Sequence, residues 1–394
     1  MNERLQKWTQ VFGPAWLVMI ADIDIASIIT ALQSGASWGY RMVFVEMILI
    51  LPLFFIQDAA GRLGTVGGWG LGEAIYKFYG KWIAIVAALP MAISDFLEYV
   101  AEYAGIAIGL YLLGLPIILG LAAVFIVHTT IVLGRRYRKA ELLLLPISFL
   151  LVISIAASTL IFHLDIRTII TIGLSPIQPY GNASFDYLIA ANTGAVIMPW
   201  MLYFHSGADS RKKLKAADLK MERLETLIGA VISEALMSII VLDGMHIKEV
   251  NGLIEASQIS AALSAFGGYA SIVMGIGFIA AGFLALVVVS LGSAWGIMDA
   301  LNRRSRNSFI KIYLLESAPA LLLVILVNNY VSLMITLMVI YTIIIIPSLF
   351  FLGRLTSNRE CMNGKPLKRY ETAIFWITSL SIVVAGITGI ALIV

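Results

Sequence analysis

Charged residues are scarce in this sequence. Only 13% of the 394 residues are Asp, Glu, Lys or Arg, whereas 60% are hydrophobic. A water-soluble fold of this length cannot bury so much apolar surface, so we expect the solvent of this chain to be lipid. The sequence has a single cysteine, Cys361, which excludes an intramolecular disulfide. Its Gly-rich stretches lack a following Gly-Lys-Ser/Thr, so no phosphate-binding loop is expected.

Apolar runs close to the ~20 residues that span a bilayer recur along the whole chain. They predict an all-α integral membrane protein with about eleven transmembrane helices, at 11–35, 40–61, 82–113, 114–134, 142–163, 187–207, 222–243, 268–296, 308–327, 329–352 and 371–393. All but three of the 27 lysines and arginines fall in the N-terminal tail or in alternate loops; the exceptions are Arg41, Arg167 and Lys248. Because cytoplasmic loops carry the excess of positive charge, the N-terminus is predicted inside and the C-terminus outside. The net charge of +3 therefore reflects topology and gives no reason to expect nucleic acid as a partner.

Three features near the ends of the predicted spans are explained without a role in a binding site. The stretch 248–265 is predicted to be a short amphipathic helix on the outer face. Asn182 begins a glycosylation sequon in an outer loop, which matters only in a eukaryotic host. His128, His163 and His246 are expected at the membrane interface.

Two carboxylates, Asp22 and Asp24, interrupt the first apolar run, where a charged side chain costs at least ~2.5 kcal/mol. An aspartate kept at this depth is a functional candidate; the alternative is that it caps a helix or bonds to a neighbouring one. On a regular helix the two side chains would point about 200° apart and could not share one ligand. Neither Gly nor Pro accompanies them, so local propensity alone predicts no break here.

The sixth span contains Pro199, which removes a backbone donor and predicts a kink or break near Ala195–Met198. One polar or interrupted span in each half of the chain, five spans apart, is typical of transporters built from inverted repeats. Asp24, Ser27 and the thioether of Met198, with carbonyls freed by the break, describe a cation site. Oxygen ligands suit a hard divalent ion and sulfur favours a softer transition metal. Met198 taken alone is better explained by packing.

The third span carries an acidic stripe of Asp95, Glu98 and Glu102 at i, i+3 and i+7. The stripe is either a proton or ion pathway or a set of helix–helix hydrogen bonds. His205, two turns past Met198, is a candidate proton shuttle near neutral pH, with a structural hydrogen bond as the alternative.

The sequence resembles the NRAMP family of divalent metal-ion transporters, over about residues 10–310 and more weakly beyond. The motifs that carry the resemblance are "GPAWLVMIADIDIASI", "LFFIQDAAGRLGTVGGWGLGEAI", "EYAGIAIGLYLLGLP", "RRYRKAELLL" and "GAVIMPWMLYFHS". The resemblance implies a LeuT-like fold of two inverted five-helix repeats, with spans one and six unwound at their middles. A single polytopic domain, 1–394, then holds a first repeat at about 11–163, a second at about 187–352 and an extra span at 371–393.

The resemblance also implies ligands for a transported metal. Asp24 falls on the family's metal-binding aspartate, and Met198 falls on its thioether ligand. Ala21 and Ala195 fall on positions whose backbone carbonyls bind the metal. The motif asparagine is replaced by Ser27, a shorter ligand that leaves room for water.

Other motif positions depart from the family as well. The Pro-Gly pair of span one is Ile25-Ala26, so its break is less strongly encoded. The histidine and asparagine that follow Met-Pro are Trp200 and Met201, and span ten lacks the expected glutamine.

The acidic pair that the family uses in proton movement aligns with Tyr99 and Glu102, so only the glutamate is kept. We therefore expect weak or altered proton coupling. Glu98, Asp22 and His205 are the other candidates for a proton or ion pathway.

These observations predict a non-enzymatic secondary transporter in the cell membrane that imports Mn²⁺- or Fe²⁺-type ions by alternating access. The metal is a substrate and no cofactor is expected; protons and the lipid bilayer are the other partners, with no obligate protein partner. One rival is an uncoupled Mg²⁺ transporter from a related branch, which takes a partly hydrated ion and is expected to lack the methionine. Another is an organic-solute carrier on the same scaffold, which is expected to have a small residue at Asp24. A receptor or assembly scaffold, for which Asp24 would be dispensable, is the third.

Overall fold

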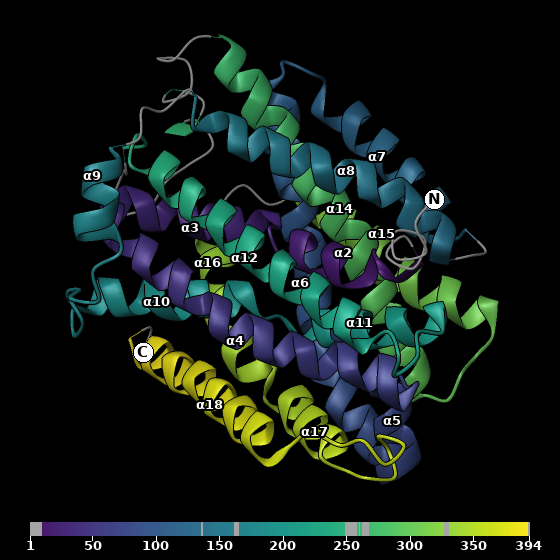
Figure 1. The fold of residues 1–394 in the computed structure, drawn as a ribbon. Helices are drawn as coiled ribbons and strands as arrows, with labels where there is room; N and C mark the ends of the chain where they lie inside the picture. The colour runs from purple at the N-terminus through teal and green to yellow at the C-terminus, as the bar shows by residue number, and fades with distance from the viewer. Residues whose placement is uncertain are drawn as a thin grey trace, which may run out of the picture.

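The computed structural model describes residues 10–134, 137–160, 165–248, 258–259, 261, 268–326 and 331–392. Within these ranges every regular element is a helix, and the long helices run largely along one common direction (Figure 1). The all-α class predicted from the sequence is confirmed.

Each expected span coincides with one helix or with two helices in succession. The helices are α2 (Pro14–Ala21) with α3 (Ile25–Trp38), α4 (Val43–Arg62), α6 (Lys81–Leu112), α7 (Ile117–Val132), α8 (Tyr137–Ser158), α10 (Ala183–Val196) with α11 (Pro199–Lys212), α12 (Leu219–Gly244), α14 (Gly268–Ala300), α15 (Arg306–Leu326), α16 (Val331–Ile344) with α17 (Ile346–Thr356), and α18 (Arg369–Ala391). Shorter elements connect them: η1 (Gly39–Met42), η2 (Leu63–Gly67), α5 (Leu71–Tyr79), α9 (Ile166–Thr168) and η3 (Ile169–Gly173).

Nine helical segments in the described part of the chain are long and apolar enough to cross a membrane, and Ile117–Val132 is a shorter apolar helix. The count of about eleven spans, the repeat boundaries and the orientation of the termini stay predictions.

The sixth span lies at the centre of the bundle. In the segment Ala183–Lys212, 89% of the most apolar window is buried inside the protein, against 28% for Arg369–Ala391. Its first half, α10, packs against α3, α16 and α18, and its second half, α11, packs against α14 and α4. The last helix, α18, lies along α4 and α10 at the periphery (Figure 1). The interrupted span is therefore walled by protein, not by lipid.

Glycines allow the helices around the first and sixth spans to approach closely. A Cβ on Gly35 of α3 would lie 1.8 Å from the carbonyl oxygen of Val241 in α12. A Cβ on Gly194 of α10 would lie 1.7 Å from the carbonyl oxygen of Met338 in α16. Small residues at such crossings let membrane helices pack backbone to backbone.

One expectation outside the site is wrong. His128 does not lie at the interface, because its side chain is fully buried, with Nε2 2.9 Å from Ser290 Oγ and Nδ1 3.2 Å from the Tyr103 hydroxyl. His163 and most of the amphipathic helix predicted at 248–265 fall outside the described residues. Asn182 caps α10 by accepting the N–H of Ser184 at 3.1 Å.

Candidate functional site

The first span is broken between Ala21, where α2 ends, and Ile25, where α3 begins. Asp24 is the N-cap residue of α3 and adopts an extended conformation, with φ −84° and ψ 179°. Its carboxylate accepts the N–H of Ser27 at 2.8 Å, as N-cap aspartates do. The unwound segment implied by the resemblance is therefore present, although residues 22–26 contain neither Gly nor Pro.

The sixth span is broken where Pro199 predicted it. Its first half ends at Val196, and Met198 is the extended N-cap residue of α11, with φ −101° and ψ 151°. Proline suits the first position of a helix, where a backbone N–H has no intrahelical partner in any case.

Both breaks free the carbonyl of an alanine. In a regular helix the N–H of residue i bonds to the carbonyl of residue i−4. The N–H of Ile25 instead donates to Glu102 Oε1 at 3.1 Å, which leaves the carbonyl of Ala21 without that donor. Pro199 has no N–H to give to Ala195, whose carbonyl accepts the hydroxyl of Ser27 at 3.3 Å. This last bond brings the two breaks together.

Three carboxylates meet beside the break in span one. Asp24, Glu98 and Glu102 each offer one oxygen, and these oxygens lie within 4.8 Å of one another. All three side chains are fully buried. Among the described residues, one oxygen of each carboxylate has no hydrogen-bond partner: Asp24 Oδ2, Glu98 Oε1 and Glu102 Oε2. Buried like charges at this distance repel strongly, and a divalent cation or protons relieve the repulsion.

Only two of the three acidic residues in the stripe of the third span belong to this cluster. Glu98 and Glu102 join Asp24, whereas Asp95 accepts a 3.5 Å hydrogen bond from Ser94 and is outside this cluster. Tyr341 of α16 holds Glu98 in place, because its hydroxyl lies 2.5 Å from Glu98 Oε2. Sequence reasoning missed Tyr341, which is one of several hydroxyl-bearing residues in that apolar run.

The remaining predicted ligands stand at or next to the same two helix breaks. Ala21, Ala195, Ser27 and Met198 are all at most 1% exposed, so the region is closed to solvent in this conformation. The N–H of Met198 lies 3.3 Å from the sulfur of Met201, the residue that stands where the family has asparagine.

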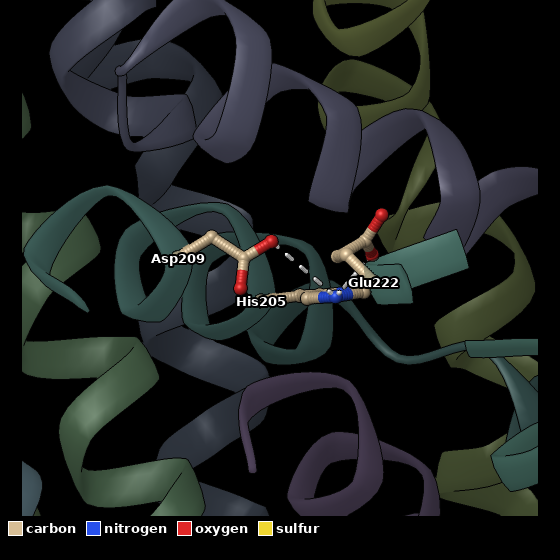
Figure 2. Close-up of side chains that lie close together, drawn as sticks. All are labelled: His205, Asp209 and Glu222. Atoms are coloured by element: carbon tan, nitrogen blue, oxygen red, sulfur yellow. Dashed lines mark ion pairs between the residues drawn. The ribbon is translucent and has the colours of Figure 1, made fainter. Parts of the chain in front are cut away.

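Asp22 and His205 do not belong to the cluster of Asp24, Glu98 and Glu102. Asp22 faces α12, where the hydroxyl of Ser233 lies 3.4 Å from its Oδ2. His205 belongs to a second buried cluster with Asp209 and Glu222, which flank its ring in Figure 2. Sequence reasoning missed both acids. Asp209 stands four residues after His205 on α11, but Glu222 comes from α12 and no spacing in the sequence predicts its position.

The chain matches a protein family over residues 15–392, the family described as "Natural resistance-associated macrophage protein-like", or Nramp. It is 25% identical over 392 residues to the divalent metal cation transporter MntH of Bacillus subtilis (strain 168). The alignment covers 95% of this chain and 90% of that relative.

Two solved structures are similar in fold. The manganese transporter of Eremococcus coleocola, in complex with an aromatic bis-isothiourea substituted compound, has a TM-score of 0.81 at 18% identity, over 100% of this chain and 88% of that one. MhsT in complex with L-phenylalanine has a TM-score of 0.64 at 11% identity, over 95% of this chain and 98% of that one. These similarities confirm the LeuT-like fold predicted from the sequence.

Proposed function

Because the chain belongs to the Nramp family, we propose that it is a secondary transporter that brings divalent metal ions into the cell. The ion is the substrate, no reaction is catalysed, and the transporter works in the cell membrane with its N-terminus in the cytoplasm. Mn²⁺ or Fe²⁺ is the preferred type of substrate, since oxygen ligands are combined with one thioether.

The observation that carries this proposal is the group of three buried carboxylates at the break in span one. Asp24, Glu98 and Glu102 keep three oxygens that have no partner among the described residues, in a region that the protein shields from water. Carboxylates at this depth are costly unless a cation or protons accompany them. We assign Asp24 the main share of charge neutralisation, with Glu98 and Glu102 beside it.

The neutral ligands come from the two breaks. The freed carbonyls of Ala21 and Ala195 supply oxygens, and Ser27 supplies a hydroxyl or holds a bridging water. Met198 supplies the sulfur that separates a transition metal from Mg²⁺.

The burial of these ligands supports transport by alternating access. Because Asp24 and Met198 are fully buried, an ion reaches them only after helices move on one side. The unwound segments between α2 and α3 and between α10 and α11 are the natural hinges. A bound ion relieves the carboxylate repulsion and so favours the closed conformation.

Proton coupling is weak or altered in this proposal. Tyr99 stands at one of the two acidic positions of the family, and Glu98 supplies a carboxylate one residue away. Glu98 and Glu102 carry protons when the site holds no metal and lose them to water along the pathway when the metal binds. Asp22 and His205 are further candidates on this pathway.

Uptake into proteoliposomes tests the proposal. Wild-type protein should take up Mn²⁺ in excess Mg²⁺, Asp24→Ala should abolish uptake, and Met198→Ala should keep transport but lose the preference for Mn²⁺. Equal competition by Mg²⁺ with no change of internal pH would instead support the uncoupled Mg²⁺ transporter. Two features favour this second candidate: Ser27 leaves room for the water of a partly hydrated ion, and Glu98 adds oxygen ligands. An absence of metal-induced heat in calorimetry would support an organic-solute carrier, and full function of Asp24→Ala would support a non-transport role.

A further inference from the structure

We propose that His205, Asp209 and Glu222 form a second binding site for a divalent transition-metal ion, distinct from the site at the helix breaks. The inference deepens the proposed function, because the second ion would be one on its way across the membrane. All three side chains are at most 1% exposed.

The three side chains converge on one point (Figure 2). His205 Nε2 lies 3.2 Å from Glu222 Oε1 and 3.8 Å from Asp209 Oδ2. Ligands about 2.1 Å from an octahedral ion lie about 3.0 Å apart when adjacent and about 4.2 Å apart when opposite. These two distances fall between the limits, and all three ligand atoms lie within 4.8 Å of one another, so one ion can bind all three side chains once they move closer together. Imidazole with carboxylates is a ligand set for Mn²⁺, Fe²⁺ or Zn²⁺.

The imidazole directs a lone pair toward the carboxylates. Its Nδ1 lies 3.0 Å from Gln57 Oε1, an acceptor, so Nδ1 carries the hydrogen and Nε2 is left as the ligand atom. Among the described residues Nε2 makes no hydrogen bond, even though Glu222 Oε1 is only 3.2 Å away. Metal-bound histidines typically donate their other ring N–H to an oxygen in this way.

Hydroxyl groups hold the two carboxylates in position. Thr226 donates to Glu222 Oε1 at 2.9 Å, and Thr65 donates to Asp209 Oδ2 at 3.0 Å. The second oxygens, Asp209 Oδ1 and Glu222 Oε2, have no partner within the described part of the chain. The carboxylates are therefore oriented and still have free ligand atoms.

The charges around the cluster leave these two carboxylates unbalanced. Neighbouring acids are stabilised in other ways: Glu141 pairs with Lys212, Asp58 and Glu371 share Arg62 and Arg223, and Glu225 accepts two backbone N–H groups. In the ion pairs formed by described residues, Asp209 and Glu222 have only His205. One imidazolium would leave a net negative charge buried, whereas a divalent cation neutralises both acids.

The wall of the site contains a glycine where a side chain would intrude. A Cβ on Gly61 of α4 would lie 2.0 Å from Glu222 Oε1 and 2.9 Å from His205 Nε2. The glycine therefore lets the carboxylate of Glu222 and the ring of His205 pack directly against the backbone of α4.

The position suits a resting point for a transported ion. His205 follows Met198 by seven residues on α11, which corresponds to about 10 Å along the helix axis. The cluster lies toward the end of α11 that precedes the basic stretch 211–215, on the side predicted to be cytoplasmic. An ion that leaves the helix breaks toward the cytoplasm would meet this cluster next.

Mn²⁺ binding to the full-length protein in nanodiscs tests the inference. Free Mn²⁺, measured by electron paramagnetic resonance, should reveal two bound ions per chain in wild type and one each in Asp24→Ala and Glu222→Gln. The matched control is Glu225→Gln, three residues further along α12. Glu225 Oε1 accepts the N–H groups of Gly13 and Trp16 at 2.7 and 2.8 Å, which an amide oxygen also accepts, so this variant should bind two ions.

A second measurement identifies the site without counting the bound ions. The ligands proposed at the helix breaks include no imidazole, so nitrogen coupling in the spin-echo modulation of bound Mn²⁺ identifies the His205 site. The coupling should persist in Asp24→Ala and disappear in His205→Gln. A single ion without nitrogen coupling, lost in Asp24→Ala, would overturn the second site and leave the proposed function standing. An Asp24→Ala protein that binds as many ions as wild type would instead contradict the proposed function.

Discussion

Replacing Glu98 by glutamine removes one negative charge from the group around Asp24 and nearly preserves the shape of the side chain. A divalent ion and a carboxylate about 5 Å apart attract each other by about 7 kcal/mol at an effective dielectric constant of about 20. The amide oxygen still offers a ligand and still accepts the Tyr341 hydroxyl, and water and neighbouring dipoles compensate part of the loss. We therefore expect Mn²⁺ binding to weaken by about 2 kcal/mol, which is roughly thirtyfold in Kd.

Titration calorimetry on purified protein measures this change. Asp95→Asn is the matched control, since Asp95 is a buried acid one turn earlier on α6 that does not join Asp24 and Glu102. It should bind Mn²⁺ within about twofold of wild type. If Glu98→Gln keeps wild-type affinity while Asp24→Ala loses binding, Glu98 adds no charge to the site and the argument from three carboxylates fails.

Three further predictions concern single groups. Tyr341→Phe removes the donor to Glu98 and should lower the stability of the protein by about 1.5–3 kcal/mol, seen in thermal unfolding; an unchanged transition would show that the hydrogen bond contributes nothing. Gly194→Ala forces a methyl group against a backbone carbonyl of α16 and should cost about 1–3 kcal/mol or more. Gly268→Ala, whose Cβ would meet no atom of the described residues within 4 Å, should stay within about 0.5 kcal/mol in the same assay. Burial raises the pKa of the Cys361 thiol to about 12, so at pH 8 maleimide should label it slowly in the native protein, about tenfold faster per pH unit upward, and rapidly after denaturation. Rapid native labelling at pH 8 would show that the thiol is accessible.

Local sequence patterns predicted the structural features that depend on residues within the same helix. Pro199 placed the break in span six within a few residues, because the missing N–H acts on its own helix. The acidic stripe on α6 indicated that Glu98 and Glu102 share a helix face, which the structure brings to Asp24.

Partners contributed by other helices could not be predicted from spacing. Tyr341 reaches Glu98 from α16, and Glu222 reaches His205 from α12. His128 was assigned to the interface because of its position near the end of a span, but hydrogen bonds from α14 and α6 hold it inside the protein. In each case a polar group acquires its role only when helices pack.

The break in span one shows how such partners replace a local signal. No residue there disfavours a helix as proline does, yet Glu102 accepts the N–H of Ile25, and Asp24 accepts the N–H of Ser27. The two acids that divert these N–H groups are also two of the three carboxylates proposed to meet the ion. The same two carboxylates therefore serve the helix break and the proposed metal site through different oxygens: Asp24 Oδ1 and Glu102 Oε1 accept the N–H groups, whereas Asp24 Oδ2 and Glu102 Oε2 have no partner among the described residues. The carbonyl of Ala21 stays free for an ion as long as Glu102 accepts the N–H of Ile25, so one glutamate supports both the helix break and the proposed ligand set.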